Sequence, residues 1–140
     1  MKKPSVWRVL IAAAAYMLLT VLASTSGLIH PACFAYSGTV LPLLWSFVYL
    51  YAAANMQMFG AAAALNGITL IIALIMGEGD LPLIIGMILF ALLAEIIRKV
   101  NGYDTLKGVR RSYIPLAFSF YAYTAHWWMD TEGALAASLK

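Results

Sequence analysis

Five long stretches of the chain are almost free of charge, and this pattern limits the fold more than any other feature. They cover residues 6–23, 34–54, 59–76, 81–97 and 113–128. Their lengths are close to the roughly 20 apolar residues that a helix needs to cross a bilayer. Because an isolated segment in lipid must satisfy its own backbone hydrogen bonds, we expect an all-α fold, a polytopic transmembrane helical bundle of about five spans.

The composition supports one integral membrane domain over residues 1–140. Hydrophobic residues make up 64% of the chain and charged residues only 11%, whereas a water-soluble domain carries about a quarter charged residues. Short connections leave no room for a sizeable domain outside the membrane. Although Lys2 and Lys3 precede the first stretch as in a secretory signal, four more apolar stretches follow, and we expect an uncleaved first span.

The charges are distributed unevenly between the two sides of the predicted bundle. Eight of the nine cations lie near the amino end or in and beside the connection 98–112. The acidic residues Glu78, Asp80, Asp130 and Glu132 fall on the other side. The positive-inside rule therefore predicts a cytoplasmic amino terminus and an external carboxyl end. This orientation also explains the net charge of +3, so no nucleic-acid partner is expected.

From Leu28 onward, a series of short motifs follows a recognisable order. It begins with His30-Pro31 and a second span that carries Tyr49 and Tyr51. It continues with FGA at 59–61, LLAEIIRKVNGY at 92–103 and SYIPLAFSF at 112–120. In the order and spacing of these motifs, the chain resembles the Trep-Strep (MptD-like) family of S components of energy-coupling factor (ECF) transporters.

The resemblance implies a binding protein in a prokaryotic plasma membrane that captures a small organic nutrient from outside. Such a protein docks onto a T-type membrane subunit and two ATPases, which drive release inside. The chain departs from the usual pattern in two respects. S components usually have six spans, so the resemblance implies that the last helix is missing here, reduced or supplied by a partner. Many also carry Ala-x-x-x-Ala on the first helix, whereas here Ala12 is followed four residues later by Tyr16.

Aromatic, imidazole and amide side chains are the candidates for ligand binding. We expect the loops 27–36 and 77–80 and the end of the fifth span to converge over the external mouth of the bundle, where such groups suit a flat nutrient. Membrane-belt positions for the aromatics and an interhelical contact for the amide are the alternatives. The candidate residues are His30, Tyr36, Trp45, Tyr49, Asn66, Tyr121, Tyr123, His126 and Trp127.

No cofactor or metal is expected, except that the two histidines could reach the iron of a haem-like ligand.

Glu95 is the ionisable residue that lies inside a predicted span, and a carboxylate in lipid needs a partner. Arg98 and Lys99 follow three and four positions later on the same helical face. We favour an ion pair over a role in proton or substrate binding. The candidates for partner binding on the cytoplasmic side are Arg98, Lys107, Arg110 and Arg111.

Small residues form two ridges in the third span, Gly60 with Ala64 and Ala63 with Gly67. Such ridges allow helices to approach closely, so we expect both of them to serve helix packing, inside the chain or against a partner.

Enzymatic activity is not expected. The sequence has no serine–histidine–acid set, no HExxH and no Walker sequence, so any ATP dependence must come from another chain. The alternative to an S component is a small membrane assembly or regulatory subunit without a ligand of its own. Such a scaffold would not need the external cluster of aromatics and histidines.

Overall fold

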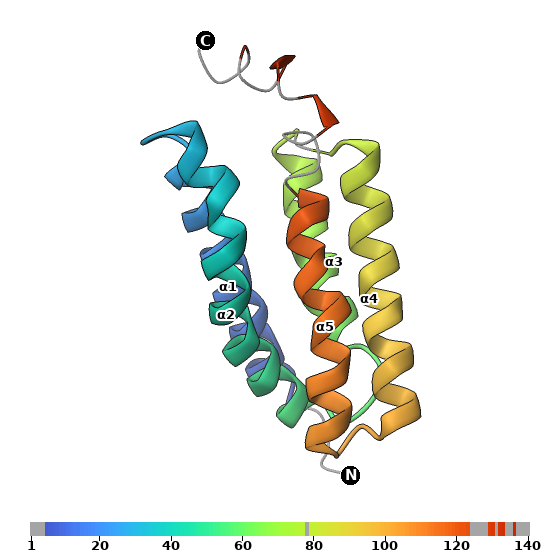
Figure 1. The fold of residues 1–140 in the computed structure, drawn as a ribbon. Coiled ribbons are helices and arrows are strands. Elements are labelled where there is room, and N and C mark those ends of the chain that lie inside the picture. The colour runs from blue at the N-terminus through green and yellow to red at the C-terminus, as the bar shows by residue number, and fades with distance from the viewer. Residues whose placement is uncertain (1–4, 78, 124–128, 131, 134–135, 137–140) are drawn as a thin grey trace.

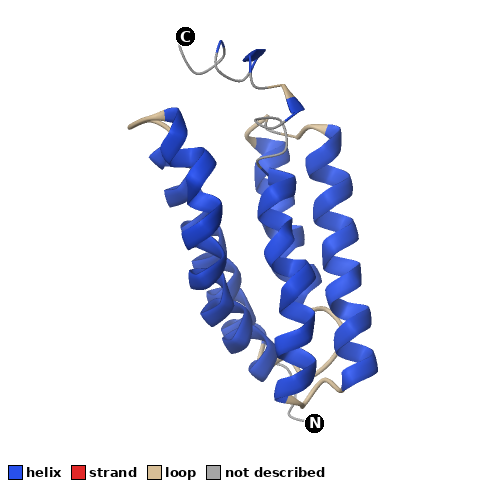
Figure 2. Ribbon diagram, in the orientation of Figure 1, coloured by secondary structure: helices blue, strands red, loops and turns tan. Residues whose placement is uncertain are grey.

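The computed structural model describes residues 5–77, 79–123, 129–130, 132–133 and 136. Five helices run through this part of the chain, α1 (Val6–Ser26), α2 (Pro31–Asn55), α3 (Ala61–Ile75), α4 (Leu81–Asn101) and α5 (Leu106–Tyr123) (Figure 1). The described residues contain no strand (Figure 2). The expected all-α fold is therefore confirmed. Two helical segments, Val6–Ala23 and Leu81–Asn101, are long and apolar enough to cross a membrane, and Val40–Asn55 and Ala61–Ile75 are shorter apolar segments.

Local capping explains where two of the helices begin. His30 precedes α2, and its Nδ1 accepts a hydrogen bond from the Ala32 amide at 3.2 Å. Asp80 precedes α4, and its Oδ1 accepts from the Leu83 amide at 2.9 Å. These side chains satisfy amides that have no partner within the helix.

The long polar connection predicted at 98–112 is wrong in extent. Helix α4 continues to Asn101 and α5 begins at Leu106, so only residues 102–105 connect them. Gly102 has a φ of 97°, a left-handed conformation that glycine adopts without strain and that ends α4. Hydropathy marks where the chain leaves the apolar layer, but helical hydrogen bonding continues through charged residues whose long side chains reach the interface.

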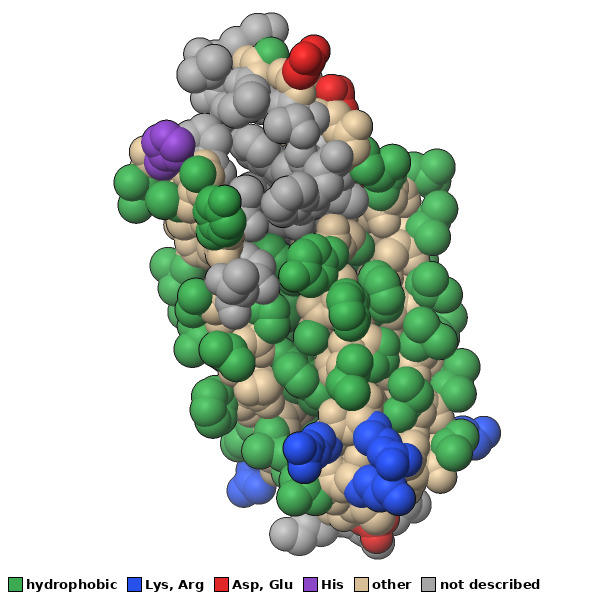
Figure 3. Space-filling view, in the orientation of Figure 1, with side chains coloured by type: hydrophobic (Ala, Val, Ile, Leu, Met, Phe, Trp, Pro, Cys, Tyr) green, Lys and Arg blue, Asp and Glu red, His purple; other side chains and the backbone are tan. Residues whose placement is uncertain are grey.

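The helices form two groups. Helices α1 and α2 lie together, and α3, α4 and α5 form the second group; the two groups approach near the amino terminus and diverge toward the other end (Figure 1). Exposed cations gather at the end where the groups meet (Figure 3). We call this the basic end and define it by Arg8, Lys99, Lys107, Arg110 and Arg111.

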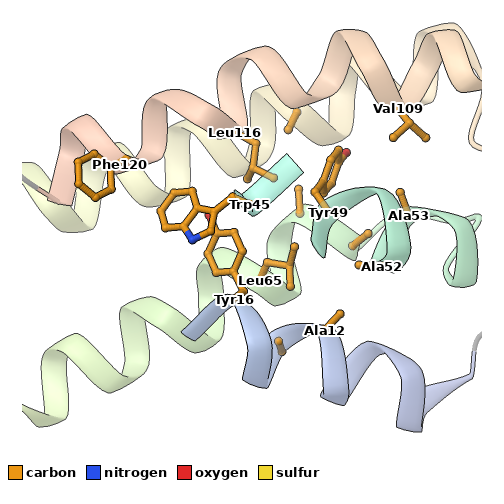
Figure 4. Close-up of a cluster of buried hydrophobic side chains, with 14 of the residues drawn as sticks. Ala12, Tyr16, Trp45, Tyr49, Ala52, Ala53, Leu65, Val109, Leu116 and Phe120 are labelled. Carbon is orange, nitrogen blue, oxygen red and sulfur yellow. The ribbon is translucent and has the colours of Figure 1, made fainter. Parts of the chain in front are cut away.

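Small residues bring the helices close together in the core (Figure 4). Ala12 and Ala13 of α1 and Ala52 and Ala53 of α2 are all buried. Tyr16 fills the position where the Ala-x-x-x-Ala pattern has its second alanine, and it is fully buried. The face of α1 that carries Ala12 and Tyr16 is therefore used inside the bundle.

Candidate functional site

The predicted external ligand residues do not form one site in the described part of the chain. His30 is exposed, and its imidazole caps α2. Tyr36 is 71% exposed and Tyr121 49%. The connections α1–α2 and α3–α4 lie apart at their end of the bundle (Figure 1). The expected convergence also involved the end of the fifth span, most of which lies outside the described residues. His126, Trp127 and the side chain of Tyr123 lie outside the described residues.

Trp45 lies in an aromatic layer near the middle of the bundle. Its ring stacks on Tyr16 with centroids 4.2 Å apart and meets the edge of Phe120 at 5.8 Å (Figure 4). The side chain is only 1% exposed, and its indole Nε1 has no hydrogen-bond partner. A buried donor of this kind is available to an acceptor that enters the aromatic layer.

Tyr49 does not lie in the half of the bundle away from the basic end, the half that the positive-inside rule predicts to be external. It lies in the half of α2 nearer the basic end, and its hydroxyl shares a 2.7 Å hydrogen bond with Ser112 of α5. The side chain is 1% exposed. In this structure Tyr49 joins two helices.

Asn66 of α3 links its helix to three others. Its Oδ1 accepts from the Tyr16 hydroxyl of α1 at 3.0 Å. Its Nδ2 donates to the Ser119 hydroxyl of α5 at 2.7 Å and to the Met87 carbonyl of α4 at 3.2 Å. An amide inside an apolar bundle needs such partners. In this structure Asn66 makes the interhelical contacts that were the alternative to ligand binding.

Glu95 of α4 caps the amino end of α3. The residue before α3 is Gly60, which has no side chain to cap the helix. Oε1 of Glu95 accepts instead from the amides of Ala62 at 2.7 Å and Ala63 at 3.4 Å. The carboxylate thus lies at the positive end of the α3 dipole, where negative charge is stabilised.

Arg98, one helical turn further along α4, binds the carboxyl end of α2. Its Nη2 donates to the carbonyls of Ala53 at 2.7 Å, Met56 at 2.6 Å and Tyr103 at 3.2 Å. Carbonyls at a helix carboxyl end carry partial negative charge. The guanidinium is therefore complementary to the end of α2.

The predicted ion pair of Glu95 with Arg98 or Lys99 is wrong in this structure. Across the residues that the structure describes, neither cation lies in salt-bridge contact with Glu95, whose hydrogen bonds go to backbone amides instead. The aligned amides at the start of α3 and the carbonyls at the end of α2 compete with a direct ion pair for the side chains of Glu95 and Arg98.

The predicted partner-binding cations divide into two kinds. Arg98 is fully buried, so it is not on the surface at which a partner would dock. Lys107, Arg110 and Arg111 are exposed at the basic end, and Arg111 donates to Asn101 at 3.0 Å.

A pocket of about 140 Å³ that is open to the outside lies between α3 and α4. Its lining includes Ala63 and Gly67 of α3 and Ala91 of α4. A methyl group added to Gly67 would contact nothing within 4 Å. The predicted ridge of Ala63 and Gly67 is therefore not used for close packing of α3 against α4.

Sequence reasoning missed Tyr16, Ser112 and Ser119 as members of the polar core. All three are fully buried, and all three hydrogen-bond to a residue on another helix. Hydroxyl groups inside an apolar stretch, or directly beside one in the case of Ser112, were the available signal. Among the described residues, no group of three or more histidine, cysteine or acidic side chains could hold a metal ion. The arrangement therefore offers hydrogen bonds, aromatic faces and one unpartnered indole donor.

Residues 5–140 match the model of the family Trep_Strep, described as a hypothetical bacterial integral membrane protein. No curated protein and no solved structure matches the chain.

Proposed function

The chain belongs to the Trep_Strep family of bacterial integral membrane proteins, and on this premise we propose that it is a substrate-binding S component of an ECF importer. It would capture a small organic nutrient from outside and pass it to a T-type subunit and two ATPases. It would bind no cofactor of its own. A haem-like molecule is the less favoured candidate for the captured ligand.

The observation that carries this proposal is the polar and aromatic layer in the middle of the bundle. Asn66, Tyr16 and Ser119 form a continuous hydrogen-bonded group there. Polar side chains inside a membrane are costly and commonly mark a ligand pathway. The unpartnered Nε1 of Trp45 adds a donor, which suits a flat nutrient with a hydrogen-bond acceptor.

A further feature supports the proposed assembly. If the basic end is cytoplasmic, as the positive-inside rule favours, Lys107, Arg110 and Arg111 are available there for the coupling module.

Co-purification tests the proposed assembly. The chain is expressed in bacteria together with a T-type subunit and its ATPases, and is isolated in a gentle detergent. We expect all the subunits together, and we expect weaker recovery for the variant Lys107→Gln/Arg110→Gln than for wild type. Recovery of this chain alone would contradict the proposal.

Ligand binding is tested separately, by native mass spectrometry of the purified chain. A co-purifying small molecule should be lost or reduced in Trp45→Phe, which keeps the aromatic ring but removes the indole donor. His30→Ala, Tyr123→Ala, His126→Ala and Trp127→Ala test the external residues in the same way. No bound molecule in wild type would contradict ligand capture.

The alternative function is an assembly or regulatory subunit without a ligand. The observation that favours it is the use of Tyr49 and Asn66 in contacts between helices. Stable recovery of the chain with a different membrane protein, and without a small molecule, would support this alternative.

A further inference from the structure

The connection 56–60 between α2 and α3 is held at both ends by one helix. Glu95 accepts hydrogen bonds from the Ala62 and Ala63 amides at the start of α3. Arg98 donates hydrogen bonds to the Ala53 and Met56 carbonyls at the end of α2. Both side chains come from α4, three residues apart, and both are fully buried.

These contacts leave three buried polar atoms of the same two side chains without a partner. They are Oε2 of Glu95 and Nε and Nη1 of Arg98. An unsatisfied buried atom of a charged group is costly. Since side chains three residues apart on a helix can reach one another, these atoms are able to meet if the backbone contacts are released.

We propose that Glu95 and Arg98 make the connection 56–60 a two-state segment. In the closed state, seen in this structure, each charge binds the end of a neighbouring helix. In the open state the connection moves away from α4, and Glu95 and Arg98 form a direct ion pair. Neither charge is then left unpaired inside the bundle, where breaking a buried pair is strongly unfavourable.

The position of the segment gives the opening a consequence. The connection lies at the basic end, where the two helix groups meet (Figure 1). Opening would therefore change the surface that a partner meets at this end. The two-state equilibrium needs neither a ligand nor a coupling module, so it is tested independently of the proposed function.

Hydrogen exchange distinguishes this switch from a fixed clamp. The Ala62 and Ala63 amides are followed by NMR in detergent micelles, with the protein labelled with ¹⁵N-alanine and the Ala91 amide of α4 as reference. In Glu95→Gln the amide oxygen can still cap α3, but the ion pair of the open state is lost and Arg98 would be left unpaired. We expect exchange at Ala62 and Ala63 to become at least threefold slower than in wild type.

A fixed clamp predicts the opposite sign, because a neutral side chain caps a helix less strongly than a carboxylate. Unchanged or faster exchange in Glu95→Gln would overturn the proposal. Lys99→Gln removes an exposed cation from the same helix and is the matched control, in which the rates should stay at the wild-type value.

A measurement on the wild type keeps the test valid if the variant does not fold. A two-state segment opens locally, so the Ala62 and Ala63 amides should exchange at least tenfold faster than the Ala91 amide. Equal rates would mean that the connection opens only when the whole bundle unfolds, and would refute the switch.

Discussion

Replacing Asn66 with alanine should destabilise the bundle more than a comparable change elsewhere in its core. Asn66 is 2% exposed and joins α3 to α1, α4 and α5. The substitution removes all three side-chain hydrogen bonds at once. Tyr16 and Ser119 then lose their partner in an apolar environment.

The size of the effect follows from the contacts. Hydrogen bonds between membrane helices contribute about 0.6 kcal/mol each on average, so three of them account for about 2 kcal/mol. The hydroxyl groups of Tyr16 and Ser119 are also left buried without this partner. With a further cost of about 1 kcal/mol for these unsatisfied groups, we expect a total loss of about 3 kcal/mol.

Thr69→Ala is the matched control. Thr69 is also buried on α3, but its hydroxyl donates to Leu65 of the same helix at 2.9 Å. We expect a loss below about 1 kcal/mol, since no bond to another helix is broken. Tyr16→Phe removes one of the three bonds and should cost about 0.6 kcal/mol.

The free energy of unfolding is measured by titrating the purified proteins from a mild detergent into SDS, with circular dichroism as the signal. A loss in Asn66→Ala no greater than that in Thr69→Ala would refute the network as a source of stability. A loss confined to Asn66→Ala, with Tyr16→Phe like wild type, would mean that the bond to α1 contributes nothing.

Two further predictions concern packing and orientation. Gly86→Ala should lower the free energy of unfolding by about 1–3 kcal/mol, because the new methyl group would lie 2.3 Å from Cβ of Ala122. Gly67→Ala places its methyl group in open space and should raise the free energy of unfolding by up to about 1 kcal/mol through helix propensity. The same SDS titration checks both variants. In cells that express a Cys33→Ser background, a membrane-impermeant maleimide should label Gly79→Cys and not Lys107→Cys; the reverse pattern would mean that the basic end is external.

The number and order of the helices could be predicted from the sequence, because both follow from local properties. The thickness of a bilayer sets the length of an apolar stretch, and the His30 and Asp80 caps act within their own helices. Membership of the family was also predictable from the order of short motifs, and the match over residues 5–140 confirms it. The extent of α4 and α5 was predicted less well, since hydropathy does not detect a helix that continues beyond the apolar layer.

The partners of the buried polar groups were decided only by the tertiary structure. From the sequence, Glu95 and Arg98 are neighbours on one helix and predict an ion pair. In the bundle, α4 passes the ends of α2 and α3, and backbone groups there bind both side chains. Likewise, Asn66 could be recognised as a buried amide, but its bonds to Tyr16 and Ser119 depend on how three helices are rotated about their axes. Hydropathy is a property of one segment at a time, whereas a hydrogen bond between helices depends on their relative positions, which the packing of all five helices sets together.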